Sequence, residues 1–214
     1  MAALEYTAKI QVHCGHFAAA NSLLEELIAL ADQKAAPYWE AYGMVEQGCV
    51  LAATGDSSGA VGRLTSAMAT LRSTGATTNA PRFPTNLARA YADLGQLDDA
   101  WRCIGEATRA MQISKETWYE AEVDRVAGEI ALQSPEPDTA KAQDYFERAL
   151  AVARRQQAKS WELRAAMNMA RLWREQGKLN EARDLLAPVH GWFSEGFDTL
   201  DLKQAKRLLD ELTP

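Results

Sequence analysis

The chain has 214 residues, of which 47% are hydrophobic and 24% are charged, and its formal net charge is −6. This composition is typical of a globular protein with a sizeable core, and its acidic balance argues against a nucleic-acid binder, which normally has a basic surface. No apolar run approaches the roughly 20 residues that span a bilayer, and the N-terminal segment up to His16 lacks the features of a signal peptide. Three cysteines far apart in the sequence suit a reducing compartment, so we expect a cytoplasmic protein that does not cross a membrane.

A short pattern recurs five times along the chain, at intervals of 40 to 42 residues. Each copy begins with a small residue, which is Ala20, Ala60, Ala100, Ala142 or Ala182. An apolar residue follows four positions later in every copy, namely Leu24, Leu64, Ile104, Phe146 and Leu186. In four of the copies a glycine lies five residues before the alanine; these glycines are Gly15, Gly55, Gly95 and Gly177. A period of this length is typical of stacked helical repeat units.

Each unit is predicted to consist of two antiparallel helices joined by a tight turn. In the second unit the helices are expected over residues 38–53 and 57–71, with a turn at residues 54–56. Glycine ends the first helix because it adopts the left-handed conformation without strain. The alanine is small because the second helix crosses the first closely there. In the fourth unit, residues 133–138 contain two prolines in place of the glycine turn, which accounts for the 42-residue interval.

The third and fifth units show the pattern most fully. Residues 86–100 and 169–182 resemble tetratricopeptide (TPR) repeats almost position for position. A final helix is expected over about 199–212, with one apolar stripe that caps the last unit. We therefore predict an all-α, right-handed α-α superhelix, a TPR-like solenoid. It would form a single domain over residues 1–214, with hairpins at about 1–36, 37–76, 77–114, 115–158 and 159–196.

A more specific resemblance covers residues 118–209. The segments 118–122, 149–160, 184–189 and 192–199 resemble the C-terminal TPR region of bacterial multidomain signalling ATPases. In those proteins a nucleotidyl cyclase or a transcription-regulator domain precedes the ATPase, and the TPR region comes last. The resemblance implies a regulatory or partner-binding module. It brings no catalytic or nucleotide-binding motif, because those motifs precede the region that matches.

Charged residues recur at equivalent positions of the first helix of successive units. In a TPR array these helices line a concave groove, so equivalent positions lie side by side. One row reads Tyr42, Arg82, Glu122 and Arg164, and a second row reads Cys49, Arg89, Glu129 and Arg171. Arg125 lies between the rows and Arg174 extends them. The candidate groove residues are therefore Arg82, Arg89, Glu122, Arg125, Glu129, Arg164, Arg171 and Arg174.

Two interpretations of these rows remain open. The charges can pair with one another across the helices and stabilise the array only modestly. Alternatively, the excess of arginine over glutamate suits an acidic peptide, a carboxylate or a phosphate. The pairing interpretation is slightly favoured, because charged helix faces often have no function.

Other candidate chemistry is weaker. His13, Cys14 and His16 lie close together at a predicted helix end, but no fourth metal ligand is evident, so no metal site is predicted. Cys49 and Cys103 occupy positions that suit small buried residues. The tryptophans are predicted to pack at helical core positions, together with Tyr91, Tyr119 and Phe146. An enzyme using His13 or His190 as a base is a third hypothesis, for which no nucleophile or acid partner can be placed.

The favoured function is a non-enzymatic binding module in bacterial signal transduction, without cofactor or catalytic residues. It would bind a protein segment or a small effector in its concave groove. In this way it would regulate an attached or partner ATPase, adenylate cyclase or transcription regulator. The alternative is a structural or oligomerisation element that forms a homodimer through an uncapped N-terminal repeat, since solenoid ends need capping. Neither hypothesis involves direct nucleic-acid or membrane binding.

Overall fold

A computed structural model describes residues 1–76 and 79–213 of the chain, and within them it contains eleven helices and no strand. The predicted all-helical architecture is confirmed. The chain divides into two compact units, with the boundary between Glu116 and Thr117. The continuity of the five hairpins as one domain stays a prediction. Among the described residues, no helix combines the length and the apolar character needed to cross a bilayer.

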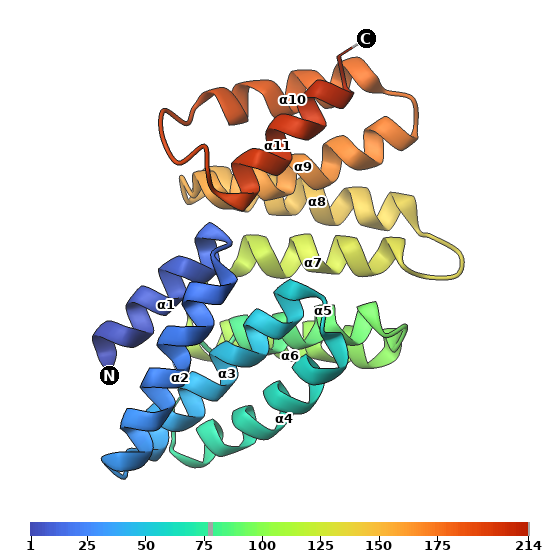
Figure 1. Ribbon diagram of the computed structural model, residues 1–214. Coiled ribbons are helices and arrows are strands. Elements are labelled where there is room, and N and C mark those ends of the chain that lie inside the picture. Colours follow the sequence, from blue (N-terminus) through green and yellow to red (C-terminus); the bar gives the residue numbers. More distant parts are fainter. Residues whose placement is uncertain (77–78, 214) are drawn as a thin grey trace. The chain divides into compact units, whose positions relative to one another are not determined.

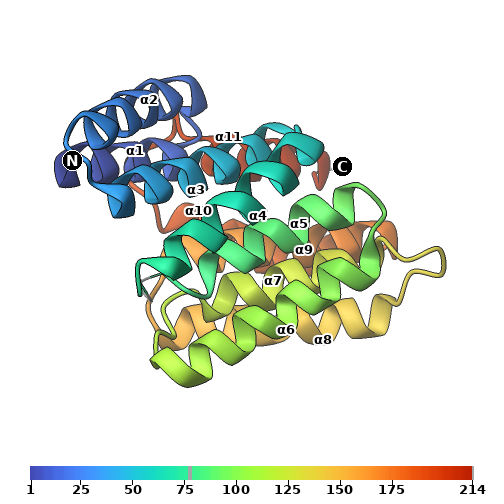
Figure 2. The ribbon, with the colours of Figure 1, turned by 90° about the horizontal axis from the view of Figure 1, so that it is seen from below.

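The first unit contains three helix pairs, which can be followed in Figures 1 and 2. The helices of each pair are joined by a short turn and pack along each other, as predicted for the first three hairpins. Their bounds are α1 Ala2–Cys14, α2 Phe17–Gln33, α3 Pro37–Thr54, α4 Ser57–Ser73, α5 Arg82–Asp93 and α6 Leu97–Ser114.

The second unit consists of two helix pairs and a final single helix. Their bounds are α7 Glu120–Leu132, α8 Thr139–Arg155, α9 Lys159–Glu175, α10 Leu179–Gly191 and α11 Leu200–Glu211. The proline-containing connection between α7 and α8 extends beyond the ends of both helices (Figures 1 and 2). It ends at Asp138, whose carboxylate accepts a hydrogen bond of 2.9 Å from the Lys141 amide and so caps α8.

The predicted turns are confirmed by their backbone conformation. All four repeat glycines have positive φ, between 74° and 89°. At Gly55 the left-handed conformation ends α3, and the next residue, Asp56, begins α4 by accepting a hydrogen bond of 3.0 Å from the Gly59 amide. The end of one helix and the start of the next are thus encoded within five residues.

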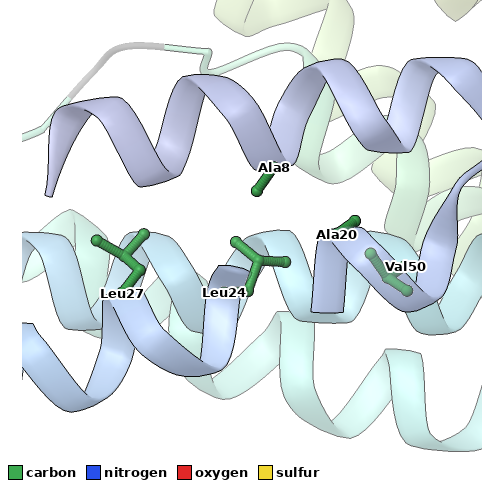
Figure 3. Close-up of a cluster of buried hydrophobic side chains, with 5 residues drawn as sticks. All are labelled: Ala8, Ala20, Leu24, Leu27 and Val50. Atoms are coloured by element: carbon green, nitrogen blue, oxygen red, sulfur yellow. The ribbon is translucent and has the colours of Figure 1, made fainter. Parts of the chain in front are cut away.

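The repeat alanines lie at the centre of each helix pair. All five are fully buried, as are four of the apolar residues that follow them. In the first pair, Ala8 of α1 points toward Leu24 of α2 (Figure 3). Ala20, Leu27 and Val50 complete this cluster. The alanine keeps the two backbones close, and the larger residue one turn later fills the space beside it.

In two hairpins, a glycine inside the first helix lets the second helix pack still closer against it. A Cβ built on Gly48 would lie 2.6 Å from Cγ of Leu64, and one built on Gly128 would overlap the ring of Phe146. Both Leu64 and Phe146 are fully buried apolar residues of the repeat pattern. The two glycines therefore make room for the side chain of the partner helix.

The last helix, α11, covers the end of the second unit. It packs against α9 and α10 (Figure 1). Its buried residues are Leu202, Ala205 and Leu208, and Leu212 just beyond its end is buried too, as predicted for a capping helix. The charged side chains Lys203, Lys206, Arg207 and Asp210 leave α11 toward solvent.

Replacing Gly128 by alanine should destabilise the protein, although alanine is more favourable than glycine inside a helix by about 1 kcal/mol. The new methyl group has no space beside the Phe146 ring, and overpacking of this kind typically costs about 1–3 kcal/mol. Urea denaturation followed by circular dichroism measures the change in the free energy of unfolding.

Gly105→Ala is the matched control. Gly105 is an exposed helical glycine of α6, and nothing lies within 4 Å of the position its Cβ would take. This variant should be more stable than the wild type by about 0.5–1 kcal/mol. Equal stability of the two variants would show that the Gly128–Phe146 crossing is not tight.

Candidate functional site

The eight predicted groove residues lie on the first helices of their hairpins. Arg82 and Arg89 belong to α5 of the first unit. The remaining six belong to the second unit: Glu122, Arg125 and Glu129 lie on α7, and Arg164, Arg171 and Arg174 lie on α9. The structure therefore places the charged residues on the predicted helices. Whether each charged side chain can contact a ligand depends on the groups with which it is already paired.

Arg82 is inside the protein. Its side chain is 2% exposed and makes a bidentate ion pair with the carboxylate of Glu46 on α3, which is 1% exposed. Nearby, Asn79 donates a hydrogen bond of 2.7 Å to the hydroxyl of Tyr42, which is another residue of the rows. The pKa of Tyr42 is raised, mainly because the side chain is buried and also because Glu46 is negatively charged. These groups tie α3 to α5 and present no surface to a ligand. Arg89 is half-buried on the same helix as Arg82.

On α7 the three candidate residues form one ion-pair triad. Arg125 lies between the two glutamates along the helix and pairs with both: its Nε lies 2.7 Å from Oε1 of Glu122, and its Nη1 contacts Glu129. Burial alone would lower the pKa of Arg125, but the two carboxylates raise it above its ordinary value. The charge of Arg125 is therefore fully compensated by its own helix.

On α9, Arg164 and Arg174 pair with carboxylates outside the predicted rows. Arg164 donates a hydrogen bond of 2.6 Å from Nε to Asp201, and its Nη1 lies 3.5 Å from Glu122. Arg174 pairs with Glu211. Asp201 and Glu211 belong to α11, so the capping helix neutralises two arginines of the preceding hairpin. The sequence pattern gave no sign of either partner, because α11 lies outside the repeat.

Arg171 differs from the other arginines of the second unit. It is half-buried, and within the described residues no carboxylate oxygen lies within the 4.0 Å of an ion pair. Its Nη1 makes only a long hydrogen bond of 3.3 Å to the amide oxygen of Asn168, which itself donates to Glu129. Burial lowers the pKa of Arg171; Glu129 opposes this effect, while Arg125 and Arg174 add to it. A guanidinium in this situation gains by binding an added anion.

The other candidate groups take part in ordinary structural contacts. Nδ1 of His16 lies 2.8 Å from Oε1 of Gln11 at the end of α1. Cys49 and Cys103 are buried, as predicted, and burial raises the pKa of Cys103 to about 11. In the described chain, no group of three His, Cys, Asp or Glu side chains is arranged to hold a metal ion. The prediction that the tryptophans are packed is wrong for Trp192, which is 60% exposed in the loop before α11, and for Trp118, which is 37% exposed just before α7.

Comparisons with known proteins establish the fold. A scan of family models and a search of curated protein sequences found no match. The similar solved structures include two of the nearly identical TPR-like repeats of a putative kinesin light chain from Podosopora anserina. One of them, a variant with a single substitution, matches with a TM-score of 0.57 and 18% identity over 88% of this chain and 92% of that one. The other structure matches with a TM-score of 0.55 and 16% identity over 99% and 95%. The chain therefore has an all-α TPR-like repeat fold.

Removing Glu46 should strongly destabilise the protein, because it takes the bidentate partner from the buried Arg82. Breaking one side of a buried ion pair typically costs about 3–5 kcal/mol. We expect a loss of this size for Glu46→Met in urea denaturation.

The double variant Glu46→Met/Arg82→Met is the matched control. It replaces both charges by apolar side chains of similar length, so it should recover most of the lost stability. If the double variant were less stable than Glu46→Met, Arg82 would have stabilising interactions that outweigh this ion pair.

Proposed function

We propose that the chain is a non-enzymatic TPR-type binding module that serves bacterial signal transduction. The TPR-like fold supports an interaction role, since such repeats present extended surfaces to partners. The resemblance of residues 118–209 to the last region of bacterial signalling ATPases supports the regulatory context. The partner would be an attached or separate ATPase, adenylate cyclase or transcription regulator. The module would work in the cytoplasm, with no cofactor and no direct contact with nucleic acid or membrane.

Arg171 is the single observation that carries the binding proposal. It is half-buried, faces no carboxylate at ion-pair distance among the described residues, and has its pKa lowered. An anionic group of a protein segment or of a small effector would bind its guanidinium. Asn168 would add a hydrogen bond, whereas the charge of Arg174, three residues further along α9, is already paired with Glu211.

The other groove residues have supporting roles in this proposal. Glu122, Arg125 and Glu129 fix the face of α7 beside which the anion binds, and Arg164 holds α9 to α11. Arg82 stabilises the first unit from within, and the half-buried Arg89 is the candidate contact of that unit. In this proposal only a few residues of the predicted rows contact the ligand, and the other row residues hold the helices in position.

Thermal-shift measurements with a heptapeptide of glutamates and with inorganic phosphate test this function. At about ten times the Kd, a ligand stabilises the folded state by about 1.4 kcal/mol, which raises the Tm by about 3–6 °C. We expect a shift of this size for the native chain, and its loss in Arg171→Gln.

Arg183→Gln is the matched control, because Arg183 lies on α10 and its guanidinium is 3.8 Å from the carboxylate of Asp184. It changes the net charge equally and should keep the shift. A shift that persists in Arg171→Gln, or that neither probe produces, would contradict the assignment of the site to Arg171.

The second candidate function is oligomerisation through the N-terminal helix. Tyr6 and Ile10 lie one turn apart on α1 and are 64% and 61% exposed, so they form an exposed apolar pair on this helix. Leu4, in contrast, packs into the core of the first pair. We therefore assign the homodimer interface of this alternative to Tyr6 and Ile10.

Sedimentation equilibrium of the chain and of Ile10→Glu tests this alternative. If α1 is an interface, the native chain should form a concentration-dependent dimer that Ile10→Glu dissociates, because a buried unpaired carboxylate is costly. A native chain that stays monomeric at millimolar concentration would exclude this function.

A further inference from the structure

An apolar groove bordered by cations lies at the end of the second unit, between α10 and α11. It has a volume of about 680 Å³, within the range of about 300–1,000 Å³ common for binding sites. Its lining comes from three segments of the chain: the last turn of α10, the following loop, and the first two turns of α11. The lining residues are His190, Phe197, Leu202, Lys203, Lys206 and Arg207.

The apolar part of the groove is held in place by the loop. Phe197 is 52% exposed, and its ring packs against His190 with 6.1 Å between ring centroids. Beside Phe197, Gly196 has φ 74°, and Thr199 donates two hydrogen bonds to the Gly196 carbonyl, 2.9 Å from its amide and 2.7 Å from its hydroxyl. Leu202, only 4% exposed, lies at the groove's inner wall. The tight turn thus presents an aromatic ring to solvent in a fixed position, which lowers the entropic cost of binding.

The cations stand on one face of α11. Lys203, Lys206 and Arg207 are exposed and spaced i, i+3 and i+4, so their side chains leave the helix on the same side. Lys206 pairs with Asp210. Lys203 and Arg207 have no carboxylate at ion-pair distance within the described part of the chain, and Arg207 makes only a 3.4 Å contact with the Lys203 carbonyl. The groove therefore has an uncompensated positive border, although the chain as a whole is acidic.

We propose that this groove docks an acidic peptide segment that carries one aromatic or large aliphatic anchor residue. The anchor side chain would enter between Phe197, His190 and Leu202, where its burial supplies most of the binding energy. Carboxylates on either side of it would pair with Lys203 and Arg207. A polyphosphate chain would leave the apolar floor uncovered, and an uncharged peptide would leave the cations without partners.

This surface is separate from the anion site at Arg171. The edge of α11 that carries Asp201 and Glu211 pairs with arginines of α9, whereas the cations leave α11 on its exposed side. The groove and the anion site at Arg171 share no residue, so a negative result in the test of one does not contradict the other.

Fluorescence anisotropy of the full chain with one labelled peptide tests the proposal. The peptide has a central tryptophan flanked on each side by three aspartates. Lys203→Glu/Arg207→Glu should weaken its binding at least tenfold, because two attractions become repulsions. Phe197→Ser should weaken it severalfold by removing the anchor contact, and a peptide with serine in place of the tryptophan should bind at least tenfold more weakly.

Three controls make the result specific. Lys34→Glu/Lys178→Glu makes the same change in net charge at exposed positions elsewhere and should leave the Kd unchanged. Arg171→Gln should also leave it unchanged; a loss in this variant alone would assign the peptide to the anion site and overturn the proposal. Absence of saturable binding, or equal binding of the serine peptide, would overturn it as well. A self-association of the chain that Lys203→Glu/Arg207→Glu abolishes would show that a second copy covers the groove instead.

Discussion

The close crossing of the two helices in each hairpin is the constraint on which the rest of the structure depends. The repeat alanines are fully buried at these crossings, and Gly48 and Gly128 allow Leu64 and Phe146 to occupy the space where a Cβ would stand. A crossing this close fixes the rotation of each first helix about its own axis. In the second unit this rotation turns one face of α7 toward α9, so that Glu122 and Glu129 come within reach of Arg164 and Asn168.

The helices could be predicted from the sequence because their ends are encoded locally. The second hairpin was expected over 38–53 and 57–71 and is found at Pro37–Thr54 and Ser57–Ser73, since a left-handed glycine and an aspartate cap mark the turn. Only some partners of the groove charges belong to the predicted rows: Arg125 pairs with Glu122 and Glu129, and Arg164 lies 3.5 Å from Glu122. The other partners could not be predicted from the repeat. Glu46, Asp201 and Glu211 lie outside the repeated rows, and Asp201 is 37 residues from the arginine it binds. Which carboxylate meets which guanidinium depends on how helices distant in sequence pack and on the reach of each side chain.

The same limit explains the incorrect prediction for Trp192. Helical core spacing is informative where a residue belongs to the repeat, as for the buried Phe146 and Tyr119. Trp192 belongs to the loop that leaves the repeat, where no periodic rule applies. There its indole lies exposed, with the ammonium of Lys159 5.7 Å from the ring centroid. Two of the exposed aromatic side chains of the protein, Trp192 and Phe197, lie in this loop, which interrupts the pattern.

Arg164, Arg125 and Arg171 differ in what an anion would have to displace in order to bind, which is the basis of the proposed site at Arg171. A ligand at Arg164 must displace Asp201, and a ligand at the buried Arg125 must displace both the buried Glu122 and the partly exposed Glu129. Each displacement exposes a paired charge and costs most of what the new contact would gain. Arg171 requires no displacement of an ion pair, because its side chain makes a long hydrogen bond to a neutral amide. In the proposed anion site, the pairing of the neighbouring arginines would make the surface more selective. Arg125, Arg164 and Arg174 already have carboxylate partners, so Arg171 would be the one guanidinium group of the second unit's rows that binds an anion without losing an ion pair.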